Sequence, residues 1–233
     1  MLTPFFALYL TGILVVRFLF LAEARAIRRD ALMLYAVGVA AVSLCYFAPD
    51  GFWFGATIAH VVLTVLILLR AERHGQEASG TRLLLLALHL GVGVVLARHQ
   101  GAVDLGPAIT RTPPVAILWI AGGLLCFKES NFFIRWFFTR IKPRPGNNEL
   151  NTEQKFRSET GHGRTIGSLE RLLVYVLLLP GQTMAVPVVV AVKALARFKR
   201  MEDDQTFAEY VIIGTFLSLL LALAAFGFVH WAG

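Results

Sequence analysis

Charged and amide side chains stand at regular spacings inside apolar stretches of this chain, and they are the residues best able to do chemistry. After Pro114, the residues Lys128, Asn131 and Arg135 are spaced i, i+3, i+7, so a helix places them on one face, with Glu129 adjacent. An ionisable group costs a few kcal/mol or more in hydrocarbon, so charges in such stretches mark functional sites.

A second set of charges lies on both sides of a Pro-Gly dipeptide in the region 163–218. Glu170 lies 11 residues before Gly181 and Lys193 lies 12 after it, so a chain reversal there brings the two side chains opposite each other. Lys193 and Arg197 share a helix face at i, i+4. Glu209, at the start of the last apolar segment, falls in the first turn of a predicted helix, where the helix dipole favours an acid.

The two sets together predict a binding site on the cytoplasmic side of a membrane. They hold three carboxylates and five cations, which leaves two positive charges uncompensated. His162 and Arg164 lie among the glycines at 161, 163 and 167, where a turn or a close approach of a ligand is expected. The predicted ligand-binding residues are Lys128, Glu129, Asn131, Arg135, His162, Arg164, Glu170, Arg171, Lys193, Arg197 and Glu209.

Three interpretations of this cluster stay open. The charges could neutralise one another in salt bridges that hold the helices in register. The surplus could instead bind an anionic head group or phosphate, with arginines making bidentate contacts. Proton- or ion-coupled transport through Glu129 or Glu170 is the third. For catalysis, Glu170 with His162 is the one plausible acid–base pair.

Composition places these charges in a membrane protein. The chain has 233 residues, of which 57% are apolar and 16% are charged, against about 45–50% and about 25% in soluble domains. The apolar residues gather in runs long enough to cross a hydrocarbon core of roughly 30 Å. The net charge of +7 comes from residues between these runs, which argues against a nucleic-acid partner.

The sequence shows no metal-binding or cofactor-binding motif. The two cysteines, Cys45 and Cys126, lie inside apolar runs expected near opposite membrane faces, so we expect no disulfide between them. His60 and His89 fall near the middle of adjacent spans without further ligands, and the expected role of each is a hydrogen bond to a neighbouring helix.

The hydropathy pattern predicts an all-α fold, a polytopic transmembrane helix bundle of about eight spans. The count becomes seven if the segment around Pro180-Gly181 is re-entrant or one continuous helix. Residues 1–233 form a single integral membrane domain, with a cytoplasmic loop at 139–164 and a helical hairpin at 165–198 that turns at 180–182. The expected spans are 2–21, 31–48, 52–69, 83–97, 114–138, 165–179, 183–197 and 206–231.

The distribution of basic residues orients these spans. With both termini outside, 16 of the 22 lysines and arginines lie in inner loops and two in outer segments, as the positive-inside rule requires. One continuous helix over 171–198 would move the basic cluster at 193–200 to the outer side. The charge count therefore favours the hairpin.

The C-terminal third carries the motif Gly-Arg-x-Ile-Gly-x-Leu-Glu-Arg from Gly163 to Arg171. It continues with Lys-x-x-Ala-Arg-Phe from Lys193 to Phe198, then Glu209-Tyr210, Gly214-Thr215 and Ser218. In these residues the chain resembles a bacterial family of multi-spanning membrane proteins known as a domain of unknown function. The resemblance implies a bacterial inner membrane and brings no known activity with it.

The function expected from the sequence is binding of an anionic lipid head group or a phosphorylated carrier at the cytoplasmic leaflet, with its translocation as a further step. A membrane enzyme of lipid or polyprenyl-phosphate metabolism and a structural subunit of a larger complex are the alternatives. The expected partners are membrane lipids, and a membrane-protein partner or a second copy of the chain.

Overall fold

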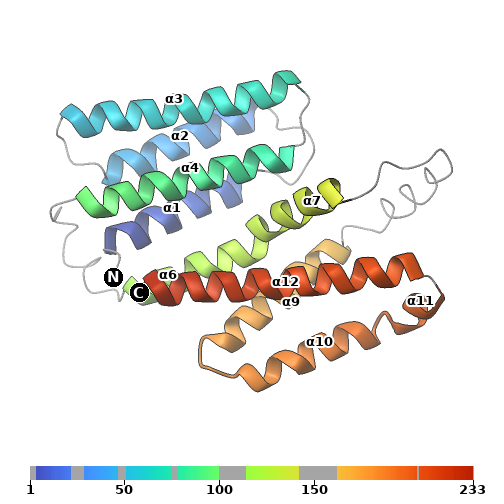
Figure 1. Ribbon diagram of the computed structural model, residues 1–233. Coiled ribbons are helices and arrows are strands. Elements are labelled where there is room, and N and C mark those ends of the chain that lie inside the picture. Colours follow the sequence, from blue (N-terminus) through green and yellow to red (C-terminus); the bar gives the residue numbers. More distant parts are fainter. Residues whose placement is uncertain are drawn as a thin grey trace. The chain divides into compact units, whose positions relative to one another are not determined.

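The computed structural model describes residues 4–21, 29–46, 51–74, 78–99, 114–141, 162–203 and 205–232. Every regular element in these ranges is a helix, so the predicted all-α class is confirmed (Figure 1). The contacts divide the chain into two compact units, residues 1–124 with 229–233 and residues 125–228. The single integral membrane domain expected from the sequence stays a prediction.

In the first unit, α1 lies against three other helices, α2, α4 and α6, and α3 completes the packing against α2 and α4. Its core includes Tyr9, Ile13 and Val39, all nearly inaccessible to solvent. At Gly38 the helices approach so closely that an added Cβ would lie 2.7 Å from a methyl carbon of Val16. The helices are α1 (Pro4–Phe20), α2 (Arg29–Tyr46), α3 (Gly51–His74), α4 (Ala78–His99) and α6 (Pro114–Leu124).

The two buried histidines of this unit hydrogen-bond across helices, as expected. His60 Nδ1 lies 3.4 Å from Ser43 Oγ, and His89 Nε2 lies 3.1 Å from the Tyr35 hydroxyl. His89 Nδ1 is 2.5 Å from the Leu85 carbonyl oxygen, which can only accept, so Nδ1 carries the proton and Nε2 accepts from the tyrosine. These bonds connect α3 and α4 to α2.

The second unit is built around α9, which packs against the turn η1 and the helices α7 and α10. Its core contains Cys126, Tyr175 and Ala222, and so joins η1, α9 and α12. The elements are the π-helical turn η1 (Leu125–Glu129), α7 (Ser130–Ile141), α9 (His162–Leu178), the 3-10 turn η2 (Thr183–Ala185), α10 (Val186–Leu195), α11 (Phe198–Asp203) and α12 (Gln205–Ala232).

The chain reverses between α9 and α10 at residues 180–182. The amide of Gly181 donates to the carbonyl of Leu178 at 3.0 Å and that of Gln182 to Leu177 at 2.9 Å, the paired bonds of a Schellman motif. Gly181 has φ +78°, a conformation that glycine adopts without a steric penalty. The Pro-Gly signal thus ends α9 and starts the return through η2 and α10.

Two helical stretches in the described part of the chain are long and apolar enough to cross a bilayer, namely Val115–Arg140 and Phe207–Ala232. They indicate association with a membrane. The eight crossings predicted from hydropathy remain a prediction. Shorter apolar helical stretches are Phe6–Phe20, Met33–Leu44, Gly55–Arg70, Gly80–Val95 and Thr183–Leu195.

Candidate functional site: a basic cavity in the second unit

A cavity of about 430 Å³ lies among the helices of the second unit. Four helical segments form its wall: α7, α9, the α10–α11 segment and α12. Its volume falls within the range of about 300–1,000 Å³ typical of small-ligand sites. The lining residues are Asn131, Ile134, Phe138, Gly167, Arg171, Lys193, Ala196, Arg197, Arg200, Phe207, Tyr210, Val211, Gly214, Thr215 and Ser218.

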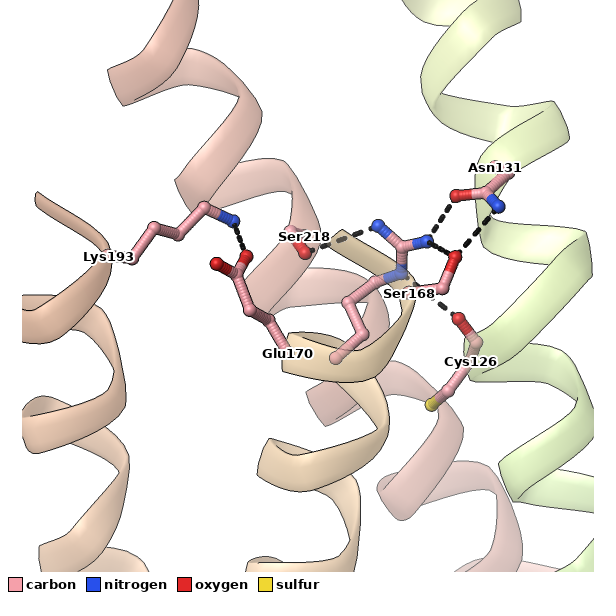
Figure 2. Close-up of polar contacts among 7 residues, drawn as sticks. Cys126, Asn131, Ser168, Glu170, Lys193 and Ser218 are labelled. Carbon is pink, nitrogen blue, oxygen red and sulfur yellow. Dashed lines mark hydrogen bonds and ion pairs between the residues drawn. The ribbon is translucent and has the colours of Figure 1, made fainter. Parts of the chain in front are cut away.

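Arg171 forms the polar end of the cavity, and its side chain is almost fully buried. Its Nε donates to the backbone oxygen of Cys126 at 3.0 Å and its Nη1 to Ser218 Oγ at 3.4 Å. Its Nη2 donates to Asn131 Oδ1 and to Ser168 Oγ. Figure 2 labels these four partners, which lie on three helical segments. The network fixes the position of one positive charge deep in the unit.

The π-helical turn supplies one of these partners. A π-turn shifts the backbone hydrogen-bond register by one residue, and such turns often occur at functional sites. Two carbonyls in η1 accept side-chain donors: Leu125 O from Ser130 Oγ at 2.9 Å, and Cys126 O from Arg171 Nε at 3.0 Å. The irregular turn therefore directs backbone acceptors towards the buried arginine.

The ion pair expected across the chain reversal is present. Lys193 Nζ of α10 lies 2.5 Å from Glu170 Oε2 of α9, and the two side chains are 11% and 21% exposed. Figure 2 shows the lysine and the glutamate pointing towards each other. Because a partly shielded pair is screened less than a surface pair, this contact helps to hold α10 against α9.

Aromatic rings line the other end of the cavity. The rings of Phe138 and Tyr210 lie 4.5 Å apart, and the guanidinium of Arg200 lies 4.1 Å from the centre of the Phe207 ring. Tyr210 precedes Ser218 by eight residues in α12, which corresponds to about 12 Å along the helix axis. The cavity thus extends from a polar end at Arg171 to an aromatic end.

The wall is strongly basic. Its four cations are Arg171, Lys193, Arg197 and Arg200, and none of its lining residues is acidic. Glu170 compensates Lys193 from outside the wall. The wall of the cavity therefore combines four cationic side chains with no acidic one, and one of the four is in an ion pair with Glu170.

The structure brings only part of the predicted site into this wall. Four of the predicted residues line the cavity, and Glu170 contacts one of them. Lys128 and Glu129 are buried in η1 and Arg135 is half-buried in α7, but none lines the cavity; Glu209 is exposed and does not line it either. The side chains of His162 and Arg164 lie outside the described residues. The four lining residues are Asn131, Arg171, Lys193 and Arg197.

The π-turn removes Lys128 from the common face that was expected for Lys128, Asn131 and Arg135. Lys128 lies within η1, where the spacing rule of an α-helix no longer applies. The face of α7 towards the cavity instead runs through Asn131, Ile134 and Phe138, which are spaced i, i+3, i+7. Arg135 lies just beside that row.

Sequence reasoning about charges missed several members of the site. Arg200 could have been found, because it lies three residues after Arg197 and seven after Lys193, on the same helical face. Ser168 and Ser218 are uncharged and gave no signal of their own. Their role appears only when Arg171 is seen to donate to both.

No protein-family model matches the chain, and no curated protein or solved structure matches it either. The fold and the cavity define an all-helical protein, with two helices suited to cross a bilayer and a basic pocket. A functional conclusion therefore has to come from this site.

Proposed function

We propose that this chain is a multi-pass protein of a bacterial inner membrane that binds an anionic lipid head group or a phosphorylated carrier at the cytoplasmic leaflet. The observation that carries the proposal is the cavity wall, which holds four cations and no carboxylate. Arginine suits this role because its planar fork makes paired hydrogen bonds to phosphate oxygens.

Exposed apolar side chains support a lipid environment. Leu195 of α10 is 73% exposed, and Phe216 and Leu220 of α12 are 63% and 61% exposed. Soluble proteins rarely expose large contiguous apolar surfaces, whereas lipid covers such surfaces without cost.

The depth of Arg171 supports movement of the head group as well as binding. Ser218, which accepts from Arg171, lies at the middle of the 28-residue helix α12. A helix of this length spans about 42 Å, more than a hydrocarbon core of roughly 30 Å. If α12 crosses the bilayer, the guanidinium lies near its midplane, and Arg197 and Arg200 lie between it and the cytoplasmic side. Such a row of cations would let a head group leave the interface without losing its charge partners.

The residues that favour this proposal are also those of the family resemblance. Nine of the fifteen lining residues belong to the motif in the C-terminal third. These residues are Gly167, Arg171, Lys193, Ala196, Arg197, Tyr210, Gly214, Thr215 and Ser218.

The enzyme alternative gains no comparable support. Glu170, its expected acid or base, is held in an ion pair by Lys193. His162 is eight residues away at the start of the same helix, and the two backbone positions are therefore about 12 Å apart along its axis. Neither the ion pair nor this separation favours proton transfer between Glu170 and His162.

Native mass spectrometry of the purified full-length protein tests the proposal. We expect a retained anionic lipid on the wild type, its loss in Arg197→Gln, and its retention in Lys199→Gln. Lys199 is the matched control because it is exposed, lies beside Arg200 in α11 and does not line the cavity. Equal retention by both variants would contradict the proposal.

The membrane topology has its own test. A reporter inserted after Gln182, in the turn between α9 and η2, is expected outside the cytoplasm. A cytoplasmic signal there would refute the predicted eight crossings and the depth assigned to Arg171.

A further inference from the structure

The α10–α11 segment forms a wall one helix thick beside the cavity. One face of the segment lines the cavity, and the opposite face exposes a row of large apolar side chains. If this unit lies in a bilayer, as proposed, lipid covers the exposed row, and the segment separates that lipid from the cavity. The inner face carries Lys193, Ala196, Arg197 and Arg200, and the outer face carries Met184, Val188, Val192, Leu195 and Phe198.

Helix α10 is loosely packed in the unit. In the range 183–203, all of which the structure describes, no side chain is buried. Two partly buried valines near the start of α10, Val186 and Val189, pack against the core of the unit. Near the end of α10, Lys193 Nζ lies 2.5 Å from Glu170 Oε2 of α9. This ion pair therefore attaches the end of α10 that lines the cavity.

Tightened turns lie at both ends of α10. The 3-10 turn η2 precedes it and follows Gly181, whose φ is +78°. At the other end, the amide of Arg197 donates to the carbonyl of Ala194 at 3.1 Å, a bond across three residues instead of four. Short 3-10 stretches between helical segments often mark hinges, and a few residues at the ends of elements absorb hinge movements. The two turns thus allow α10 to move as a rigid rod.

Resting on the proposed function, we infer that α10 is a lateral gate through which a lipid head group passes between the bilayer and the cavity. The Glu170–Lys193 ion pair is the latch that holds this gate closed. The ligand is accordingly an amphiphile that enters from the lipid phase, not a small anion that enters from water. Its tail stays among the exposed apolar side chains of α10, and its head group lies among the basic ones.

A ligand in the cavity acts on the latch. Lys193 lines the cavity, so the negative charge of a head group there attracts its ammonium group and competes with the carboxylate of Glu170. A variant that weakens the latch lowers the barrier to opening and should speed both entry and release of the lipid. The rates change through the gate, and the equilibrium occupancy changes through the freed lysine.

Hydrogen–deuterium exchange of the full-length protein in lipid nanodiscs tests the latch. Exchange of a local segment reports its opening equilibrium, and one contact changes such an equilibrium by a factor of about 5 or more. In Glu170→Gln we expect the amides of residues 190–197 to exchange faster by that factor, and those of α9 and α12 to exchange as in the wild type. Glu202→Gln is the matched control, because Glu202 is exposed in α11 and does not line the cavity.

A charge reversal separates the latch from the charge of the cavity. The double variant Glu170→Lys with Lys193→Glu restores the ion pair with its partners exchanged, so exchange in α10 should return towards the wild-type rate. The same variant places a carboxylate in the cavity wall, so retention of an anionic lipid in native mass spectrometry should fall.

The order in which lipid and a cross-link are added tests the entry route. In a background with Cys45→Ala and Cys126→Ala, the positions of the latch are replaced by Glu170→Cys and Lys193→Cys. A bifunctional maleimide long enough to replace the two side chains then joins α9 to α10. Bridging the delipidated protein in detergent before phosphatidylglycerol is added should prevent binding, and bridging afterwards should trap the lipid through washing. Native mass spectrometry measures both.

Four results would overturn the gate and leave the proposed function intact. They are unchanged exchange of α10 in Glu170→Gln, faster exchange spread equally over α9 and α12, equal binding of phosphatidylglycerol in both orders of addition, and its displacement from the bridged protein by glycerol 3-phosphate, which enters from water. A wild-type protein that retains no anionic lipid would refute the proposed function instead.

Discussion

The substitution Arg171→Lys separates the charge of the buried arginine from its geometry. The lysine keeps the positive charge but replaces a planar fork with a single ammonium group. In the wild type, Nε and Nη1 donate in different directions, to Cys126 O and to Ser218 Oγ, while Nη2 donates to Asn131 and Ser168. One ammonium cannot reach acceptors on three helical segments at once.

We expect the substitution to lose at least two of these four hydrogen bonds. Hydrogen bonds to a charged group contribute about 1.5–3 kcal/mol each in soluble proteins, whereas interhelical polar contacts in a membrane average about 0.6 kcal/mol. The free energy of unfolding should therefore fall by at least about 1 kcal/mol, and by about 3 kcal/mol if the larger value applies. Retention of an anionic lipid in native mass spectrometry should fall in parallel.

Reversible unfolding in mixed micelles, followed by tryptophan fluorescence, measures the first effect. Arg140→Lys is the control: Arg140 is exposed near the end of α7, and its guanidinium lies 5.7 Å from the centre of the Trp136 ring. A surface change of this kind should stay within about 0.5 kcal/mol. If Arg171→Lys also stayed within that limit, the buried hydrogen-bond network would contribute no measurable stability to the unit.

Three further substitutions test other contacts. Glu170→Gln removes the partner of Lys193 and should raise the fraction of protein that retains an anionic lipid in native mass spectrometry; an unchanged or lower fraction would show that the ion pair does not compete with the ligand. Gly38→Ala places a Cβ 2.7 Å from a methyl carbon of Val16 and should destabilise the first unit by about 1–3 kcal/mol. Gly55→Ala is the control, because an added Cβ there has no atom within 4 Å and should not destabilise the unit. Equal effects of the two substitutions on the free energy of unfolding would contradict the close approach at Gly38. Gly181→Ala should cost about 1–2 kcal/mol of unfolding free energy because its φ is +78°; no loss would argue against this turn geometry.

Hydropathy located the helices well because the apolar runs of the sequence coincide with helices over most of the described residues. The differences are at helix ends. The span expected at 52–69 belongs to a helix that continues to His74, because charged residues such as Arg70 and Arg73 continue a helix beyond the apolar run. The π-turn at Leu125–Glu129 had no such signal. Two of its carbonyls are bound by side chains, one of them 45 residues away in the chain, a contact that local sequence does not specify.

The candidate site was predictable to the extent that it is charged and regularly spaced. The positions of Glu170 and Lys193 about the Pro-Gly turn predicted their contact, and the i, i+4 spacing placed Arg197 beside Lys193. Glu209 and Tyr210 show the limit of such reasoning. Adjacent residues on a helix point about 100° apart. Tyr210, which is uncharged, lines the cavity, and Glu209 does not.

Two glycines of the cavity wall, Gly167 and Gly214, are not required by close packing or by backbone conformation. An added Cβ at Gly214 would meet Phe138 no closer than 3.8 Å, and one at Gly167 would meet Arg171 at 3.7 Å, which are ordinary contacts. Neither backbone has a positive φ. Glycine inside a helix costs about 0.5–1 kcal/mol relative to alanine, so packing and conformation both favour a larger residue at these two positions. In contrast, Gly38 is required because any side chain there would collide with Val16. What glycine provides at 167 and 214 is open volume beside the cations of the wall, and the proposed anion site would use that volume.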